Sequence, residues 1–175
     1  MSQNLDQKDL QILDLLQRNS NDSVKEIGEK IGLSFTPTYD RIKYLEKNGF
    51  IEKYAAILNR KKIGIDLVAY CNVTIRNQSK QSLDEFEQEI RQYDEVQEVL
   101  SLSGTYDYML KIATNNIDTY NNFITNVLAN TPNIYQYHSS IVLNEIKREN
   151  TYKLLEKEHQ LDMENEKNSS KKNKL

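Results

Sequence analysis

The sequence has little of what secreted, metal-binding and membrane proteins depend on. Its single cysteine, Cys71, excludes an internal disulfide and a cysteine-based metal site. The two histidines, His138 and His159, are far apart, and a lone histidine in a predicted strand is more often structural than catalytic. No apolar run approaches the roughly 18 residues that span a bilayer, and the first residues do not resemble a secretory signal. We therefore expect a cytoplasmic protein that makes no membrane contact.

Motifs for catalysis and cofactor binding are also missing. The sequence contains neither a phosphate-binding G-x-x-x-x-G-K-[ST] run nor a dinucleotide-binding G-x-G-x-x-G run. It offers no nucleophile placed beside a base and no metal-ligand spacing. We therefore predict no catalytic residues, no metal and no cofactor, and we do not expect an enzyme.

Charge is distributed unevenly along the chain. Residues 1–66 hold 11 basic and 10 acidic side chains, and residues 67–145 hold 4 and 10. Within the first block, residues 34–62 carry 7 basic and 3 acidic side chains. A basic segment followed by an acidic block fits two domains, the first of which contacts a polyanion.

The first domain, expected over residues 1–58, shows signals for three helices. Asp6 is placed to cap a first helix that ends in the polar run at 18–21. Ser23 and Glu26 form an S-x-x-E capping box that opens a second helix. Gly32 suits its end, because a helix commonly terminates in a left-handed residue.

A third helix is predicted over residues 36–48, with Ser34 as its cap. Its inward positions, Thr38, Ile42 and Leu45, follow the i, i+4, i+7 spacing of one helix face. Two short helices joined through Gly-Leu-Ser predict a helix-turn-helix, whose second helix enters the major groove of DNA. Alternating residues over 50–58 predict a two-stranded wing after it.

The outward side of this third helix supplies the candidate DNA contacts. Hydroxyl groups and the helix N-terminus suit phosphate, and basic side chains add attraction that salt screens. The alternative, a plain helical bundle with solvated lysines, is compatible with the same pattern. The candidate DNA-binding residues are Ser34, Thr36, Pro37, Tyr39, Asp40, Arg41, Lys43, Tyr44 and Lys47.

The second domain, expected over residues 67–150 after a linker at 59–66, is predicted to be a ferredoxin-like βαββαβ module. The chain is therefore of the α+β class. Ser82 and Asp118 are the expected caps of the two helices, and Gly104 lies in the turn between the middle strands. One sheet face is left open, so a second copy of the chain is the expected cover. Residues 151–175 are expected to form a polar, partly disordered tail. The predicted strands are 67–76, 96–103, 106–114 and 134–143.

The run from Gly32 to Ile51, together with the order of elements over residues 5–150, resembles the Lrp/AsnC (leucine-responsive, feast/famine) transcription regulators. The resemblance implies a sequence-specific regulator of double-stranded DNA. It also implies a homodimer that assembles to a tetramer or octamer, with a small-molecule effector, an amino acid or related metabolite, bound at a subunit interface.

The loop from Ser103 to Lys111 matches the family's effector motif, except that Thr105 stands where an acidic residue is common, which puts a response to leucine in doubt. A glycine permits close approach of a ligand to the backbone, and a carboxylate can accept from an α-ammonium group. The candidate effector-binding residues are Gly104, Thr105, Tyr106, Asp107, Tyr135, Gln136, His138 and Ser140.

Two alternatives remain at this stage. Some haem-pathway decarboxylases share the two-domain architecture, but they call for basic and histidine residues in the second domain, which here is acidic and holds one histidine. The other alternative is an oligomerising module without DNA contact, against which the polar face of the third helix argues.

Overall fold

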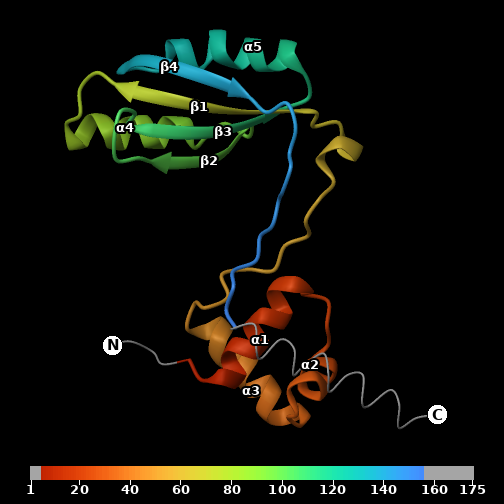
Figure 1. Cartoon of the computed structure of the whole chain (residues 1–175). Helices are drawn as coiled ribbons and strands as arrows, with labels where there is room; N and C mark the ends of the chain where they lie inside the picture. The colour runs from red at the N-terminus through yellow and green to blue at the C-terminus, as the bar shows by residue number, and fades with distance from the viewer. Residues whose placement is uncertain (1–4, 156–175) are drawn as a thin grey trace. The chain divides into compact units, whose positions relative to one another are not determined.

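The computed structural model describes residues 5–155 and divides the chain into two compact units (Figure 1). The first unit combines the residues up to Ala56 with the segment that starts at Lys147, and the second runs from Ile57 to Ile146. Within the described range, no helix has the length and apolarity to cross a membrane.

Three helices build the first unit. They are α1 (Gln7–Arg18), α2 (Val24–Ile31) and α3 (Phe35–Lys47). The capping box of Ser23 and Glu26 is present, and Gly32 ends α2 with a φ of 70°. Ser34 precedes α3 as predicted, but its side chain makes no capping hydrogen bond. The apolar stripes of the three helices meet in one core made of Ile12, Leu15, Leu16, Ile27, Ile31, Ile42 and Leu45.

The predicted two-stranded wing is wrong, because residues 48–59 contain no strand. The backbone N–H groups of Phe50 and Ile51 both donate to the carbonyl of Leu45, which closes the end of α3. The backbone N–H groups that a first wing strand would use for pairing therefore bond to the end of the helix instead. Ile57 and Leu58 are left 68% and 59% exposed instead of packing in a hairpin.

The segment after the second unit returns to the first and packs against α1. The side-chain amide of Gln17 accepts from the N–H of Tyr152 and donates to its carbonyl, both at 2.8 Å. Leu155 is buried, 6% exposed. Residues 151–155 of the predicted tail are thus joined to the first unit through Gln17 and the buried Leu155. The rest of the predicted tail, with its expected disorder, lies outside the described residues.

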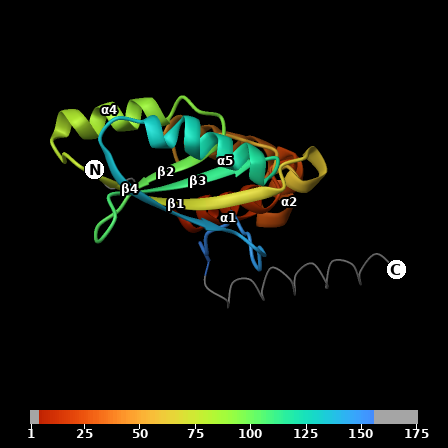
Figure 2. The same cartoon turned by 90° about the horizontal axis from the view of Figure 1, so that it is seen from above.

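The second unit is an antiparallel four-stranded sheet with strand order β2-β3-β1-β4. Figure 2 shows its helices on the same side of the sheet. The α+β prediction and the βαββαβ order are confirmed. Short 3₁₀ turns precede β1 (Arg60–Ile63) and follow α5 (Leu128–Asn130). The elements are β1 (Leu67–Ile75), α4 (Lys80–Ile90), β2 (Val96–Ser101), β3 (Tyr108–Thr114), α5 (Ile117–Asn126) and β4 (Ile134–Ile141).

Both predicted helix caps in this unit are wrong by a few residues. Ser79, not Ser82, caps α4, and its side chain accepts from the N–H of Ser82. Asn116, not Asp118, caps α5 and accepts from the N–H of Thr119. In each case another residue with a short polar side chain lies two or three residues earlier and caps the helix there.

The central strand β1 separates the two faces of the sheet by its period of two. Its odd-numbered residues from Ala69 to Ile75 are buried in the core, where the helices contribute Phe86, Ile90, Tyr120 and Phe123. Its even-numbered residues Tyr70, Asn72 and Thr74 lie on the open face and are partly exposed. The sheet therefore presents a second, mixed polar and apolar surface.

One core tyrosine gives the second unit a measurable response to alkaline pH. Tyr108 is 3% exposed and donates to Glu87 at 2.9 Å, and burial, then this hydrogen bond, raises its pKa to about 12. In the unfolded chain its pKa lies near 10. Stability from the protonated phenol is therefore complete below pH 10 and is lost as pH rises toward 12.

We expect a spectrophotometric titration to show late-titrating tyrosines, one of which disappears in Tyr108→Phe. Tyr54 is another, because burial and a hydrogen bond to Glu46 raise its pKa to about 12. Tyr54→Phe is therefore the matched control. If the Tyr108 phenol ionised near pH 10, as in the unfolded chain, its described burial would be contradicted.

Candidate nucleic-acid interface and effector site

The orientation of α3 is set by three side chains on its inner face. Thr38, Ile42 and Leu45 are buried as predicted, at 0%, 6% and 0% exposure. The Thr38 hydroxyl donates to the carbonyl of Ser34 at 2.9 Å, which satisfies it inside the core. Because this face is fixed against α1 and α2, the opposite face of α3 points to solvent.

The solvent-facing side of α3 holds most of the predicted DNA contacts. Its hydroxyls, those of Ser34 and Thr36, lie at the helix N-terminus, where backbone N–H groups are unpaired and the dipole favours anions, and its lysines and tyrosines follow along the rest of the helix. The exposed members of the predicted set are Ser34, Thr36, Pro37, Tyr39, Asp40, Lys43, Tyr44 and Lys47.

Arg41, the remaining member, lies at the margin and is held by the protein itself. One of its guanidinium nitrogens donates to Asp6 at 2.6 Å and to Asp9 at 2.7 Å. These hydrogen bonds, that to Asp9 first, raise the pKa of Arg41. Since Asp6 and Asp9 also form the capping box of α1, Arg41 ties the start of α1 to α3. The positive charge of Arg41 is therefore paired with two carboxylates of the same chain.

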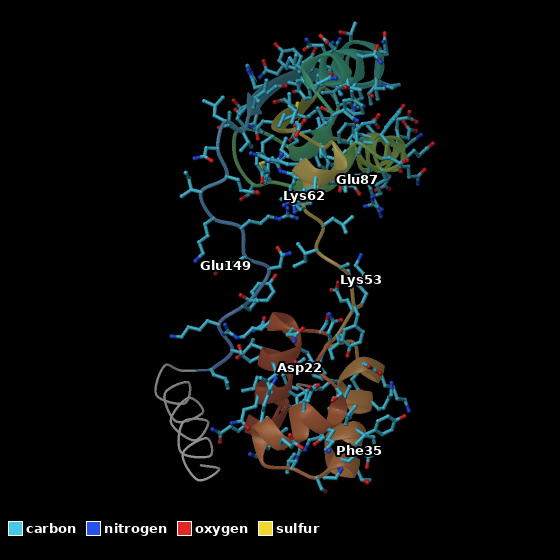
Figure 3. The ribbon with its side chains drawn as sticks, turned by 90° about the vertical axis from the view of Figure 1, so that its right-hand side faces the viewer. Asp22, Phe35, Lys53, Lys62, Glu87 and Glu149 are labelled. Carbon is cyan, nitrogen blue, oxygen red and sulfur yellow. The ribbon has the colours of Figure 1, made fainter. Side chains whose placement is uncertain are left out.

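Phe35 is a surface residue of α3 that sequence reasoning missed. The third helix was expected to start at residue 36, whereas Phe35 is its first residue and is 58% exposed (Figure 3). Its ring stacks on Tyr39 with centroids 6.1 Å apart and planes 10° apart. The Lys43 ammonium lies 5.7 Å from the Tyr39 ring centroid on the same helix. We call Phe35, Tyr39 and Lys43 the aromatic stripe.

The predicted effector loop lies between β2 and β3. Gly104 has a φ of 131°, a backbone conformation that favours glycine. The carboxylate of Asp107 accepts from the N–H of Ile75 at 2.7 Å and from the amide of Gln78 at 2.8 Å. Asp107 therefore anchors the loop to the end of β1.

The last strand contributes the second predicted group of effector residues. Gln136, His138 and Ser140 pair in register with Thr74, Asn72 and Tyr70, and so lie on the open face. His138 contacts Tyr106 of the loop edge-on, with ring centroids 5.7 Å apart. The structure thus brings the two predicted groups together at this pair.

Two further positions modify the predicted effector site. Tyr135 falls at the register shift between Gln136 and Ile134, which separates it from the other predicted residues of β4. Thr74, which sequence reasoning missed, has a buried hydroxyl oxygen without a hydrogen-bond partner among residues 5–155. The same range holds no cluster of three or more His, Cys, Asp or Glu residues suited to a metal.

Comparison with known proteins places both halves of the chain. A family model described as AsnC-type helix-turn-helix domain matches residues 5–46, and a second, described as Lrp/AsnC ligand binding domain, matches residues 68–152. A proline dehydrogenase transcriptional activator of Rhizobium radiobacter is 32% identical over 143 residues, which is 82% of this chain and 92% of that protein. The chain belongs to the Lrp/AsnC family.

Two further transcriptional regulators are similar to this chain, one in sequence and one in both sequence and structure. The transcriptional regulator AzlB of Bacillus subtilis is 35% identical over 144 residues, covering 82% of this chain and 92% of that protein. A crystal structure of a Neisseria meningitidis transcriptional regulator in complex with L-Met is 30% identical, with a TM-score of 0.82 over 86% of this chain and 97% of that one.

Membership identifies the chain as a transcriptional regulator with a DNA-binding helix-turn-helix and a ligand-binding domain. The Lrp/AsnC family consists of regulators and not of enzymes, in agreement with the prediction from the sequence. The enzymatic alternative is thereby set aside.

Proposed function

We propose that α3 is the recognition helix, which enters the major groove of double-stranded DNA with its solvent-facing side. The observation that carries this proposal is the division of α3 into a buried face and a face that exposes hydroxyls and lysines. Ser34 and Thr36 contact phosphate at the helix N-terminus, and Lys47 attracts the backbone through its charge. Arg41 holds α3 against the start of α1 through its hydrogen bonds to Asp6 and Asp9.

The salt dependence of DNA binding tests this proposal. We expect Lys47→Ala to weaken binding on every duplex to a similar degree and to flatten the slope of log affinity against log salt by about 0.9, because one phosphate contact is lost. Fluorescence anisotropy at several salt concentrations measures both quantities. Lys153→Ala is the matched control, because it removes an exposed lysine from residues 147–155, the return segment that follows the second unit and belongs to the first. An unchanged slope in Lys47→Ala would refute the assigned contact.

The second unit, in the same proposal, binds an amino acid or related metabolite beside the loop at Gly104 and the open-face residues of β4. Support comes from the exposed loop with its left-handed glycine, from the Tyr106–His138 contact, and from the partnerless Thr74 hydroxyl, which a polar ligand would satisfy. Each Asp107 oxygen keeps one lone pair for a ligand ammonium. Thr105 is an exposed residue of the same loop.

Oligomerisation belongs to the proposal because the open sheet face needs a cover. Leu100 on β2 is 44% exposed, and Met109 on the neighbouring β3 and Tyr70 on β1 are partly exposed. A second copy would bury this face in a homodimer, and further copies would complete a tetramer or octamer that acts in the cytoplasm on its DNA. Ligand binding at the interface would shift the oligomer and the spacing of paired α3 helices.

Titration calorimetry with a panel of the common amino acids, L-methionine and L-leucine included, tests the effector proposal. We expect at least one amino acid to bind and to change the solution mass measured by light scattering. Because Thr105 replaces the common acidic residue, we do not expect L-leucine to be the tightest ligand. The absence of binding across the panel, or the mass of a single chain under all conditions, would contradict the proposal.

A further inference from the structure

We infer that the aromatic stripe of Phe35 and Tyr39 reads thymine methyl groups in the major groove, so that this protein selects A·T pairs at the positions facing the start of α3. This inference rests on the proposed DNA-binding role of α3. It adds the chemical feature of the base that is read.

The first argument is the construction of the stripe. Residues at i, i+4 and i+8 follow one line along a helix, and the stripe occupies positions 35, 39 and 43. Phe35 stacks on one side of the Tyr39 ring, and the ammonium of Lys43 lies over that ring 5.7 Å from its centroid. Lys43 is held in turn by Glu46 at 2.6 Å. The two rings are therefore positioned before any partner arrives, which lowers the entropic cost of binding.

The second argument is the exposure of the rings. Phe35 and Tyr39 are 58% and 43% exposed, so two adjacent aromatic side chains of a small domain remain in contact with water. Exposed apolar surface that is contiguous and preorganised commonly marks a contact site. Burying it in a complex supplies a favourable free energy that the free protein does not realise.

The third argument identifies the occupant. The first turns of a recognition helix contact base edges, and Phe35 is the first residue of α3. Among the groups in the major groove, the C5-methyl of thymine is the apolar one, and phenylalanine is a side chain suited to contact it. The exposed side of α3 around the stripe carries the Thr36 hydroxyl and the Lys47 ammonium, which complement a phosphate backbone, together with the Asp40 carboxylate; this polar surface does not match an apolar protein surface.

The test compares thymine with uracil, which keeps the same hydrogen-bonding edge and lacks the methyl group. A tight duplex is first selected from a random library with the wild-type chain, and each thymine is then replaced singly by uracil. We expect the wild type to lose about fourfold in affinity at one or two positions, which corresponds to one methyl group removed from water. Phe35→Ala should bind the thymine and uracil duplexes equally at those positions.

Two further variants distinguish a loss of thymine recognition from a general loss of folded structure. Tyr39→Phe keeps the stacked ring and should keep the thymine preference. Tyr152→Ala removes an 80% exposed aromatic side chain from the return segment of the same unit and should leave every ratio unchanged. Circular dichroism confirms that each variant is folded before affinities are compared.

The outcomes distinguish this inference from the proposed function. Specific binding without any effect of uracil, or an effect that persists in Phe35→Ala, would overturn the reading of methyl groups while leaving the recognition helix in place. A change of solution mass in Phe35→Ala without a change in the thymine-to-uracil ratio would assign the stripe to a protein contact and also overturn it. Failure of the wild type to select any duplex would overturn the proposed function itself.

Discussion

Gly28→Ala is expected to lower the free energy of unfolding of the first domain by about 2 kcal/mol and to abolish most DNA binding near physiological temperature. A Cβ at this position would lie 2.7 Å from the carbonyl oxygen of Leu33 and 3.0 Å from the hydroxyl of Thr38. Both neighbours are fixed by hydrogen bonds, from Leu33 to the Gly28 carbonyl and from Thr38 to Ser34. The higher helix propensity of alanine, about 1 kcal/mol, offsets only part of this clash.

Chemical denaturation followed by circular dichroism measures the change, and Gly32→Ala is its control. Gly32 also belongs to the end of α2, but no atom lies within 4 Å of an added Cβ, and the cost comes from its φ of 70° alone. That cost is about 1 kcal/mol. A loss in Gly28→Ala no greater than that in Gly32→Ala would show that α2 and the turn into α3 are not packed as described.

Arg41→Ala is the second large effect, with an expected loss of about 2 kcal/mol in the stability of the first domain. The substitution leaves the Asp9 side chain, 8% exposed, without its cationic partner. The expected loss of stability is smaller than for a fully buried ion pair, because the Arg41 side chain is 33% exposed. The salt slope of DNA binding should change far less than in Lys47→Ala, since Arg41 is engaged by Asp6 and Asp9.

A double-mutant cycle with Asp9→Asn measures the interaction directly. We expect Asp9→Asn to recover part of the loss in the Arg41→Ala background, because the uncompensated charge is then removed. If the two substitutions were additive and Arg41→Ala flattened the salt slope by about 0.9, Arg41 would be a phosphate contact, as its place in the sequence first indicated.

Much of the fold could be predicted because periodicity reports burial. Thr38, Ile42 and Leu45 share a helix face by spacing alone, and the structure buries all three. The alternation over 67–76 likewise identified the buried residues of β1 from Ala69 to Ile75, although Val68 on the opposite face is buried as well. Ser23 and Glu26 form their capping box because both partners lie within one turn, so the sequence contains the whole motif.

Local prediction failed where two local patterns competed for the same residues. The motif at Ser82 looked like a cap, but Ser79 three residues earlier takes that role. The alternation after α3 looked like a hairpin, but the closure of the helix on Leu45 uses the N–H groups of Phe50 and Ile51.

In the candidate sites the limit was mainly long-range contact. Arg41 has the charge expected of a DNA contact, and only the approach of α1 to α3 reveals its two carboxylate partners. The return of the chain to Gln17 joins residues 135 positions apart, which no local pattern indicates. Phe35 escaped notice because the start of α3 was placed one residue too late.

Covalent trapping on DNA tests the central claim, that the exposed face of α3 lies in the major groove. The chain is favourable for this experiment because its single cysteine, Cys71, is buried, and burial raises its pKa and lowers its reactivity. Thr36→Cys therefore provides the reactive thiol, to be paired with a duplex from the selected pool that carries a thiol-tethered base in the major groove. The account predicts a disulfide-linked complex with Thr36→Cys and none with Lys153→Cys; equal trapping of both, or trapping of Lys153→Cys alone, would contradict it.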